Sequence, residues 1–260
     1  MSTEEWQTFC AHVTCEMLHH VKPFVSPISK VLSDEHGEHL GSGSYVGDPS
    51  ARFLITNEHV ARHIRSAPLT HQFLDANVVL RCTNNFVVKE EPFDVAASHI
   101  SDDSWSHCRH SSLSIPLDRF AVSHDPVESE LLFIIGYSGE RSSFHFGTLN
   151  SPGTPYLTQG CPMPTENGDP QFHFAIHYNT EHARQVPGPR RDLPTPPGMS
   201  GSLVWNTRAV ETLRSNGSWD PSMAFVTGIV WGWPSSATAL LATRVEQIRI
   251  RELCANAACA

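Results

Sequence analysis

Pro197-Gly198-Met199-Ser200-Gly201-Ser202, followed by an apolar run at 203–205, is the stretch that decides the fold we expect. A serine hydroxyl is a weak nucleophile, so it needs a neighbouring base and N–H donors aimed at a developing oxyanion. Gly198 can adopt backbone angles closed to other residues and turn its N–H, with that of Ser200, toward one point. The alternative interpretation is a plain Gly/Ser turn before a strand.

Two upstream segments supply a base and an acid. Residues 53–60 read Phe-Leu-Ile-Thr-Asn-Glu-His-Val, a strand-like run that ends at His59, and residues 91–96 place Asp94 before small apolar residues. Taken singly, His59 also fits a structural role and Asp94 a turn or a cap. Taken with Ser200, they suit a general base, an orienting acid and a nucleophile.

Three other carboxylates compete for the role of the acid or adjoin the base. Asp102 and Asp103 are rival acids, but they lie in a polar stretch without an apolar continuation. Glu58 precedes His59, and we expect it to point to the other side of the chain.

Four motifs in this order resemble the trypsin-like (chymotrypsin-fold) serine peptidases, and most closely their bacterial branch, which includes the high-temperature-requirement proteases. They are Gly-Ser-Gly-Ser at 41–44 leading into the run that ends at His59, Asp-Val-Ala at 94–96, Gly-Met-Ser-Gly-Ser at 198–202, and Gly-Ile-Val-Trp-Gly at 228–232. The resemblance covers roughly residues 23–250.

The fold class that the resemblance implies is all-β. It consists of two antiparallel six-stranded β-barrels (chymotrypsin-like) with the active site between them, plus N-terminal and C-terminal helices. Short strands with frequent turn signals fit this class. We expect an N-terminal helix at 1–22, a first barrel at 23–120, a second barrel at 121–243, and a C-terminal helix and tail at 244–260.

Several local predictions follow the spacing of apolar residues and turn formers. They are a helix at 3–21, a short helical turn at 60–65, one strand at 143–149, loops at 150–170 and 180–197, and a helix at 242–253. We expect Ile248 and Leu253 of the last helix to pack on the second barrel.

The resemblance assigns roles to the site residues. His59 takes the Ser200 proton and passes it to the leaving amine, Asp94 fixes the imidazole tautomer, and the N–H groups of Gly198 and Ser200 form the oxyanion hole. Val230, Trp231 and Gly232 would bind extended substrate as an added strand.

The same resemblance places Pro194, six positions before Ser200, at the base of the primary pocket. No carboxylate stands there to meet an arginine or lysine, so we expect a small or medium apolar residue before the scissile bond. Asp192 is near enough in sequence to leave the trypsin-type preference open. Met199 replaces the aspartate that receives a freed N-terminus in many relatives, so we expect no such activation.

Composition limits the partners. Net charge is −9 without a basic block, which argues against a nucleic-acid partner. There are seven scattered cysteines and no evident signal peptide or membrane span, which favours a reducing, cytoplasmic compartment. Sixteen histidines form no recognised ligand set, so we predict no metal and no cofactor.

These observations favour a cytoplasmic serine endopeptidase that acts on a protein or peptide substrate. A regulatory protein partner is an open alternative for how activity is controlled. A different class of function is a catalytically silent, protease-fold module that holds a peptide strand. An esterase is a third hypothesis, although the Gly-x-Ser-x-Gly elbow is not matched because Ser202 occupies its last position.

Overall fold

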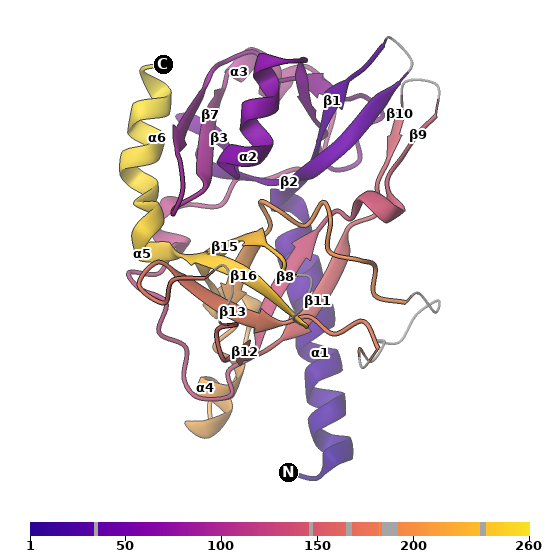
Figure 1. The fold of residues 1–260 in the computed structure, drawn as a ribbon. Helices are drawn as coiled ribbons and strands as arrows, with labels where there is room; N and C mark the ends of the chain where they lie inside the picture. The colour runs from indigo at the N-terminus through magenta and orange to yellow at the C-terminus, as the bar shows by residue number, and fades with distance from the viewer. Residues whose placement is uncertain (34–35, 146–147, 165–167, 182, 184–191, 235–237) are drawn as a thin grey trace.

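Two curled antiparallel sheets divide the molecule, the first in the upper half and the second in the lower half of Figure 1. The computed structural model describes residues 1–260 except 34–35, 146–147, 165–167, 182, 184–191 and 235–237. Part of the loop expected at 180–197 therefore lies outside the described residues.

The first sheet has the strand order β5-β4-β1-β2-β3-β7-β6. Its strands are β1 (Val25–Val31), β2 (Gly37–Asp48), β3 (Ala51–Thr56), β4 (Leu69–His71), β5 (Leu80–Arg81), β6 (Phe86–Lys89) and β7 (Val95–Ile100). As described, this sheet has seven strands where we expected six. The additional strand is β4, three residues long, which pairs with β1.

The second sheet has the order β11-β8-β14-β15-β16-β13-β12 and also contains seven strands in the described part of the chain. Its strands are β8 (Leu132–Gly136), β11 (Thr154–Thr158), β12 (Gly160–Cys161), β13 (His173–His177), β14 (Leu203–Asn206), β15 (Phe225–Gly232) and β16 (Ala239–Arg244). A separate antiparallel pair consists of β9 (Ser143–His145) and β10 (Thr148–Asn150).

Several local predictions need correction. Residues 143–149 are not one strand, because β9 and β10 run in opposite directions. The loop expected at 150–170 contains β11 and β12. Pro155 argued against a strand here, but it is tolerated because β11 lies at the edge of the described sheet, beside β8.

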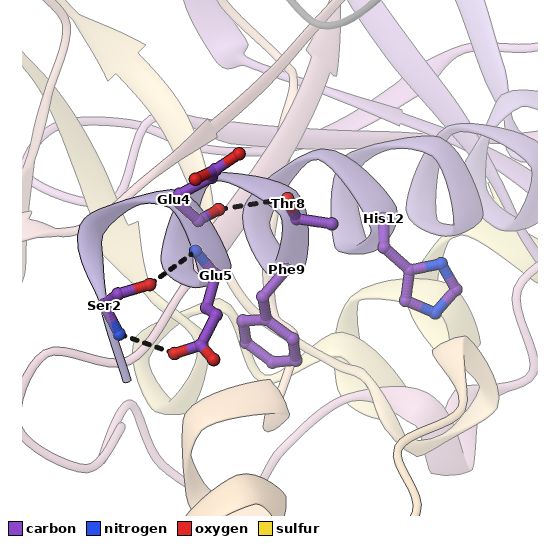
Figure 2. A pocket seen from close by; sticks show the side chains of 6 residues that line it. All are labelled: Ser2, Glu4, Glu5, Thr8, Phe9 and His12. Carbon is purple, nitrogen blue, oxygen red and sulfur yellow. Dashed lines mark hydrogen bonds between the residues drawn. The ribbon is translucent and has the colours of Figure 1, made fainter.

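The helix α1 (Thr3–Val21) matches the helix expected at 3–21. Ser2 and Glu5 form a capping box at its start, each side chain bonded to the other residue's backbone N–H, as Figure 2 shows. Val13, Met17 and Val21 form its buried stripe at helical spacing.

The short helix α2 (Glu58–Ala61) continues into the 3-10 turn η2 (Arg62–Arg65). The helical turn therefore begins at Glu58, two residues before its expected start at 60. His59 lies inside it and not at the end of a strand.

The C-terminal helix prediction was partly wrong. Residues 242–244 belong to β16, and Arg249, with φ of 51°, separates α5 (Val245–Ile248) from α6 (Ile250–Ala258). The helix α5, which carries Ile248, contacts β15 and β16 as expected. The helix α6, which carries Leu253, contacts β3, β6 and β7 of the first sheet instead.

Each terminal helix thus contacts the sheet that is farther from it along the chain. The helix α1 contacts β8 and β11 of the second sheet, whereas α6 lies along the first (Figure 1). The remaining helical segments are η1 (Lys22–Phe24), α3 (Asp102–Ser106), η3 (Leu117–Arg119), η4 (Gly139–Arg141), α4 (Ala209–Arg214) and η5 (Pro221–Met223). Across the described ranges, no helix combines the length and apolar character needed to cross a bilayer.

One apolar cluster joins the two halves. It includes Val46 and Ile55 of the first sheet, Phe133 and Trp205 of the second, and Met17 of α1, all at most 1% exposed. Burial of such side chains contributes roughly 1.5–3 kcal/mol each, so this shared core fixes one sheet against the other.

Candidate active site

Asp94 ends a tight turn that leads into β7. Its own N–H and that of Phe93 both donate to the Glu90 carbonyl, and its φ is 45°, in the left-handed region. The residue is 5% exposed. This conformation aims the carboxylate at the start of α2 and away from solvent.

Both oxygens of the Asp94 carboxylate bind His59. Oδ1 accepts the His59 backbone N–H at 2.9 Å, a group that a helix start leaves free, and Oδ2 lies 2.6 Å from Nδ1. Because a carboxylate only accepts, Nδ1 carries the proton of this hydrogen bond, and in the neutral ring Nε2 is then the nitrogen with the lone pair. The structure therefore brings together the predicted base and acid.

The rival carboxylates lie elsewhere. Asp102 and Asp103 open α3, and Asp102 pairs with Arg52 at 3.1 Å. Glu58 reaches toward Arg62, 4.0 Å away on the next helical turn.

Three side chains hold the carbonyls of the acid turn in place. Asn57 Nδ2 donates to the Asp94 carbonyl at 2.6 Å. From the second sheet, His173 Nε2 donates to the Pro92 carbonyl at 2.7 Å and Thr243 Oγ1 to the Phe93 carbonyl at 2.8 Å. We did not predict these residues from the sequence. Only Asn57 gave a local signal, because it stands two positions before the predicted base.

The oxyanion loop, residues 194–200, has a hydrogen bond to every backbone carbonyl. The donors are Tyr178 Oη to Pro194 (2.7 Å), Ser138 Oγ to Thr195 (3.0 Å), Met199 N–H to Pro196 (2.8 Å), Gly139 N–H to Pro197 (2.9 Å), Ser42 Oγ to Gly198 (2.9 Å), Ser202 N–H to Met199 (3.1 Å), and Ser42 N–H to Ser200 (2.7 Å).

The N–H groups of the same loop are used differently. Its three prolines have none, the Thr195 N–H donates to Glu140 at 2.9 Å, and the Met199 N–H closes a turn onto Pro196. No acceptor among the described residues takes the N–H of Gly198 or Ser200. These are the two donors expected for the oxyanion hole.

Their orientation follows from the neighbouring carbonyls. In a trans peptide the C=O and N–H point to opposite sides. The Pro197 carbonyl faces Gly139, so the Gly198 N–H points away from Gly139; the Met199 carbonyl faces Ser202, so the Ser200 N–H points away from Ser202.

Glycine is required at 198. Its φ is 95°, and a Cβ there would lie 2.6 Å from the Tyr137 carbonyl oxygen and 2.8 Å from His39 Nε2. His39 itself bonds the Tyr137 carbonyl through Nε2 at 2.8 Å, and burial lowers its pKa, which favours the neutral ring.

Met199 is 1% exposed and packs in the core of the second sheet with Val204 and Val230. The side chain beside Ser200 is therefore anchored by apolar packing, where the resemblance led us to compare it with an ion-pairing aspartate.

Ser200 and Val60 lie against the same residue of β2, Gly41. A Cβ built on Gly41 would be 3.0 Å from the Ser200 carbonyl oxygen and 2.8 Å from the side chain of Val60, the neighbour of His59. No hydrogen bond joins Ser200 Oγ to His59 Nε2 in the described part of the chain. Catalytic hydrogen bonds are often long before substrate binds.

Of the three residues expected to pair with an extended substrate, Val230 already has both of its backbone groups bonded within the protein. The Val230 N–H donates to Ser202 and its carbonyl accepts from Gly201, each at 2.8 Å, so Val230 has no free backbone group to offer. Trp231 stands at a register shift of β15 against β16, with its ring 4.8 Å from that of His173. Gly232 pairs with Leu241.

The residues near the predicted pocket base are two apolar residues and the exposed Asp192. Pro194 is buried, and its carbonyl accepts the Tyr178 hydroxyl. Leu193 packs against the apolar core of the second sheet that also contains Met199. Asp192 is exposed, and its backbone carbonyl accepts from Arg141.

Other features of the described residues point to no second site. No group of three or more His, Cys, Asp or Glu side chains is arranged to hold a metal ion within those ranges. A shallow surface hollow beside the first turns of α1 contains none of the predicted site residues; it is lined by Ser2, Glu4, Glu5, Thr8, Phe9 and His12 (Figure 2).

No protein-family model matches this sequence, and no curated protein matches it. Solved structures do. The MamO protease domain from Magnetospirillum magneticum, apo form, is 12% identical with a TM-score of 0.51, over 90% of this chain and 97% of that one. The active form of the Rv3671c protease from M. tuberculosis is 18% identical with a TM-score of 0.50, over 92% and 83%.

A third structure, catalytically active tobacco etch virus protease complexed with product, is 14% identical with a TM-score of 0.48, over 90% and 79%. At such identities a likeness concerns the fold alone. Together with the two curled sheets, the MamO and Rv3671c structures show that this chain has a chymotrypsin-like fold.

Proposed function

We propose that this chain is a serine endopeptidase that hydrolyses peptide bonds through an acyl-enzyme on Ser200. The observation that carries the proposal is the oxyanion loop, where all seven carbonyls are bonded and, within the described ranges, the N–H groups of Gly198 and Ser200 have no acceptor. Donors held in place without an acceptor suit a site where negative charge develops during the reaction.

The proposed mechanism uses the pairing of His59 with Asp94. Ser200 Oγ attacks the substrate carbonyl carbon while His59 Nε2 takes its proton, and the carbonyl oxygen becomes an oxyanion facing Gly198 and Ser200. Collapse of this intermediate breaks the C–N bond, and His59 returns the proton to the leaving amine. Water then attacks the ester by the same route, which releases the acid and restores Ser200.

Covalent labelling tests this function. A fluorophosphonate probe should phosphonylate Ser200 with release of fluoride, and intact mass should show one adduct per chain. Peptide mapping should place the adduct on Ser200. Absence of labelling in the folded wild-type chain would contradict the proposal.

The alternative, a catalytically silent peptide-binding module, is favoured by one observation. In the described residues His59 bonds Asp94 but no hydrogen bond links it to Ser200. A module of this kind would bind an extended peptide in a calorimetric titration and remain unlabelled by the probe, whereas an endopeptidase would be labelled.

We further propose a preference for a small or medium apolar residue before the scissile bond. The support is Pro194 at the expected pocket base and its apolar neighbour in sequence, Leu193, which packs against the core that contains Val230. Cleavage of a peptide library, read by mass spectrometry, tests the preference. Predominant cleavage after arginine or lysine would refute it.

Another proposal concerns activation. Because α1 is folded structure and Met199 is packed in the core, we propose that the full chain needs no N-terminal cleavage. Intact mass and probe labelling of the same sample test this; labelling confined to molecules trimmed within the first 25 or so residues would refute it. A regulatory partner that accelerates labelling, and a cytoplasmic location, remain proposals.

A further inference from the structure

Ser42, in the Gly-Ser-Gly-Ser stretch of β2, makes four hydrogen bonds with residues of both halves. Its Oγ donates to the Gly198 carbonyl and accepts the Tyr137 N–H, each at 2.9 Å. Its N–H donates to the Ser200 carbonyl at 2.7 Å, and its carbonyl accepts Thr56 Oγ1 at 2.8 Å. Ser42 itself is 1% exposed.

The position of these bonds matters because of Gly198. Two peptide planes flank its Cα, and glycine by itself does not favour one arrangement of them. The Gly139 N–H holds the plane before Gly198, through the Pro197 carbonyl. The plane after it is held at both ends, by the Ser42 hydroxyl through the Gly198 carbonyl and by the Met199 N–H through the Pro196 carbonyl.

The plane before Gly198 carries its N–H, and the Met199–Ser200 plane, held by the Ser202 N–H, carries the Ser200 N–H. The plane after Gly198 joins these two. With the Gly198 carbonyl released, only the Met199 N–H bond to Pro196 still resists rotation about the Gly198 Cα–C bond, which moves Met199 and Ser200 relative to the Gly198 N–H. The second contact, from the Ser42 N–H to the Ser200 carbonyl, restrains the peptide that follows the nucleophile. Ser42 therefore contacts the residues that carry both donors.

We propose that Ser42 is a positioning residue for the oxyanion site, acting from the first sheet on the donors of the second. This inference rests on the proposed function of Ser200. Ser42 does not touch the reacting atoms; it acts through the Gly198 carbonyl. Its loss lowers the rate of the chemical step and leaves ground-state binding of a substrate unchanged.

The chain offers a matched control on the same strand. Ser44 is also 1% exposed, and its Oγ has no hydrogen-bond partner among the described residues. Ser44→Ala removes a buried hydroxyl two residues along β2 without touching the oxyanion loop.

The experiment compares wild type, Ser42→Ala, Ser42→Cys and Ser44→Ala. Two readouts are used: the rate constant for fluorophosphonate labelling, and kcat and KM for p-nitrophenyl acetate, whose acyl group passes to Ser200 as p-nitrophenolate leaves. Near-ultraviolet circular dichroism checks the fold of each variant.

We expect Ser42→Ala to slow labelling and lower kcat by about tenfold to a hundredfold, with KM changed less than threefold, because removal of one whole oxyanion donor costs about 10²–10³ in kcat. Ser42→Cys should lie between Ala and wild type, since a thiol is a weak donor of similar size. Ser44→Ala should react like wild type.

The outcomes separate the two proposals. A labelled wild type with Ser42→Ala as fast as Ser44→Ala overturns the role of Ser42 and leaves the proposed function standing. An unlabelled wild type overturns both. If Ser42→Ala does not fold, Ser42→Cys decides, and a folded Ser42→Cys with the wild-type rate overturns the inference.

Discussion

The acid turn, residues 90–94, and the oxyanion loop are held in contrasting ways. In the acid turn both carboxylate oxygens of Asp94 are already bonded to His59, and the carbonyls of Pro92, Phe93 and Asp94 are bonded as well. In the oxyanion loop all carbonyls are bonded, but two N–H groups have no acceptor among the residues that the structure describes. The acid turn thus has its acceptors bonded, which orients His59. The oxyanion loop instead keeps two donors for the negative charge that we expect to develop on the substrate.

Each region is also held by the opposite sheet. Ser42 of the first sheet bonds the oxyanion loop of the second, while His173 and Thr243 of the second sheet bond the acid turn of the first. The two halves of the site therefore depend on each other's side chains.

The largest effect is expected from Ser200→Ala, which removes the proposed nucleophile from the oxyanion loop. Labelling should disappear, and hydrolysis should fall by several orders of magnitude, with only residual catalysis from the oxyanion donors. Melting temperature should stay close to wild type. Undiminished hydrolysis in a folded variant would show that Ser200 is not the nucleophile.

Asp94→Asn should come next. The amide keeps the shape of the carboxylate but donates to Nδ1, which forces the proton of His59 onto Nε2. The base is then lost, so kcat should fall by about 10⁴. Steady-state kinetics with the fold checked by circular dichroism test this. An unchanged kcat would mean that Asp94 does not set the tautomer.

Gly198→Ala should lower kcat by about 10²–10³, the cost of one misplaced oxyanion donor. A methyl group at φ of 95° would press on the Tyr137 carbonyl and on His39. Gly139→Ala is the matched control, since a Cβ there meets only ordinary contacts at 3.7 and 3.9 Å. Equal activity of the two variants would contradict the assigned role of Gly198.

The sequence predicted the residues at the centre of these tests, because the base, the acid and the serine each stand within a recognisable local motif. It also predicted α1 and most strands, where apolar spacing is regular. It did not predict His173 or Thr243 at the acid turn, because their partners are far along the chain. The strands β4 and β12 were missed because they are very short, and β11 because it contains Pro155. The strand β16 was missed as well, and its last residues were taken for the start of a helix.

Thr243→Val removes the hydroxyl that holds the Phe93 carbonyl and keeps the side-chain shape. Thr227→Val is its control, because Thr227 is equally buried and bonds His124 away from the acid turn. Each should lower the free energy of unfolding by about 1 kcal/mol. Only Thr243→Val should also slow labelling, severalfold, and an equal slowing in both would show a purely structural role.

The smallest effect is expected from reductant. All seven cysteines are free thiols, so thermal melts with and without reductant should have the same midpoint. Both regions of the site should therefore keep their activity under reducing conditions. A large fall in the midpoint on reduction would contradict the assignment of free thiols.

The packing of the C-terminal helix α6 on the first sheet has a consequence for synthesis on the ribosome. The first sheet is translated early, but α6, which covers it with Ile250, Leu253 and Ala257, is translated after every strand of the second sheet. Until α6 emerges, the strands that orient His59 and Asp94 have an apolar face open to water. A competent site is thus a late product of translation, and a nascent chain stalled before residue 245 would be inactive toward its neighbours.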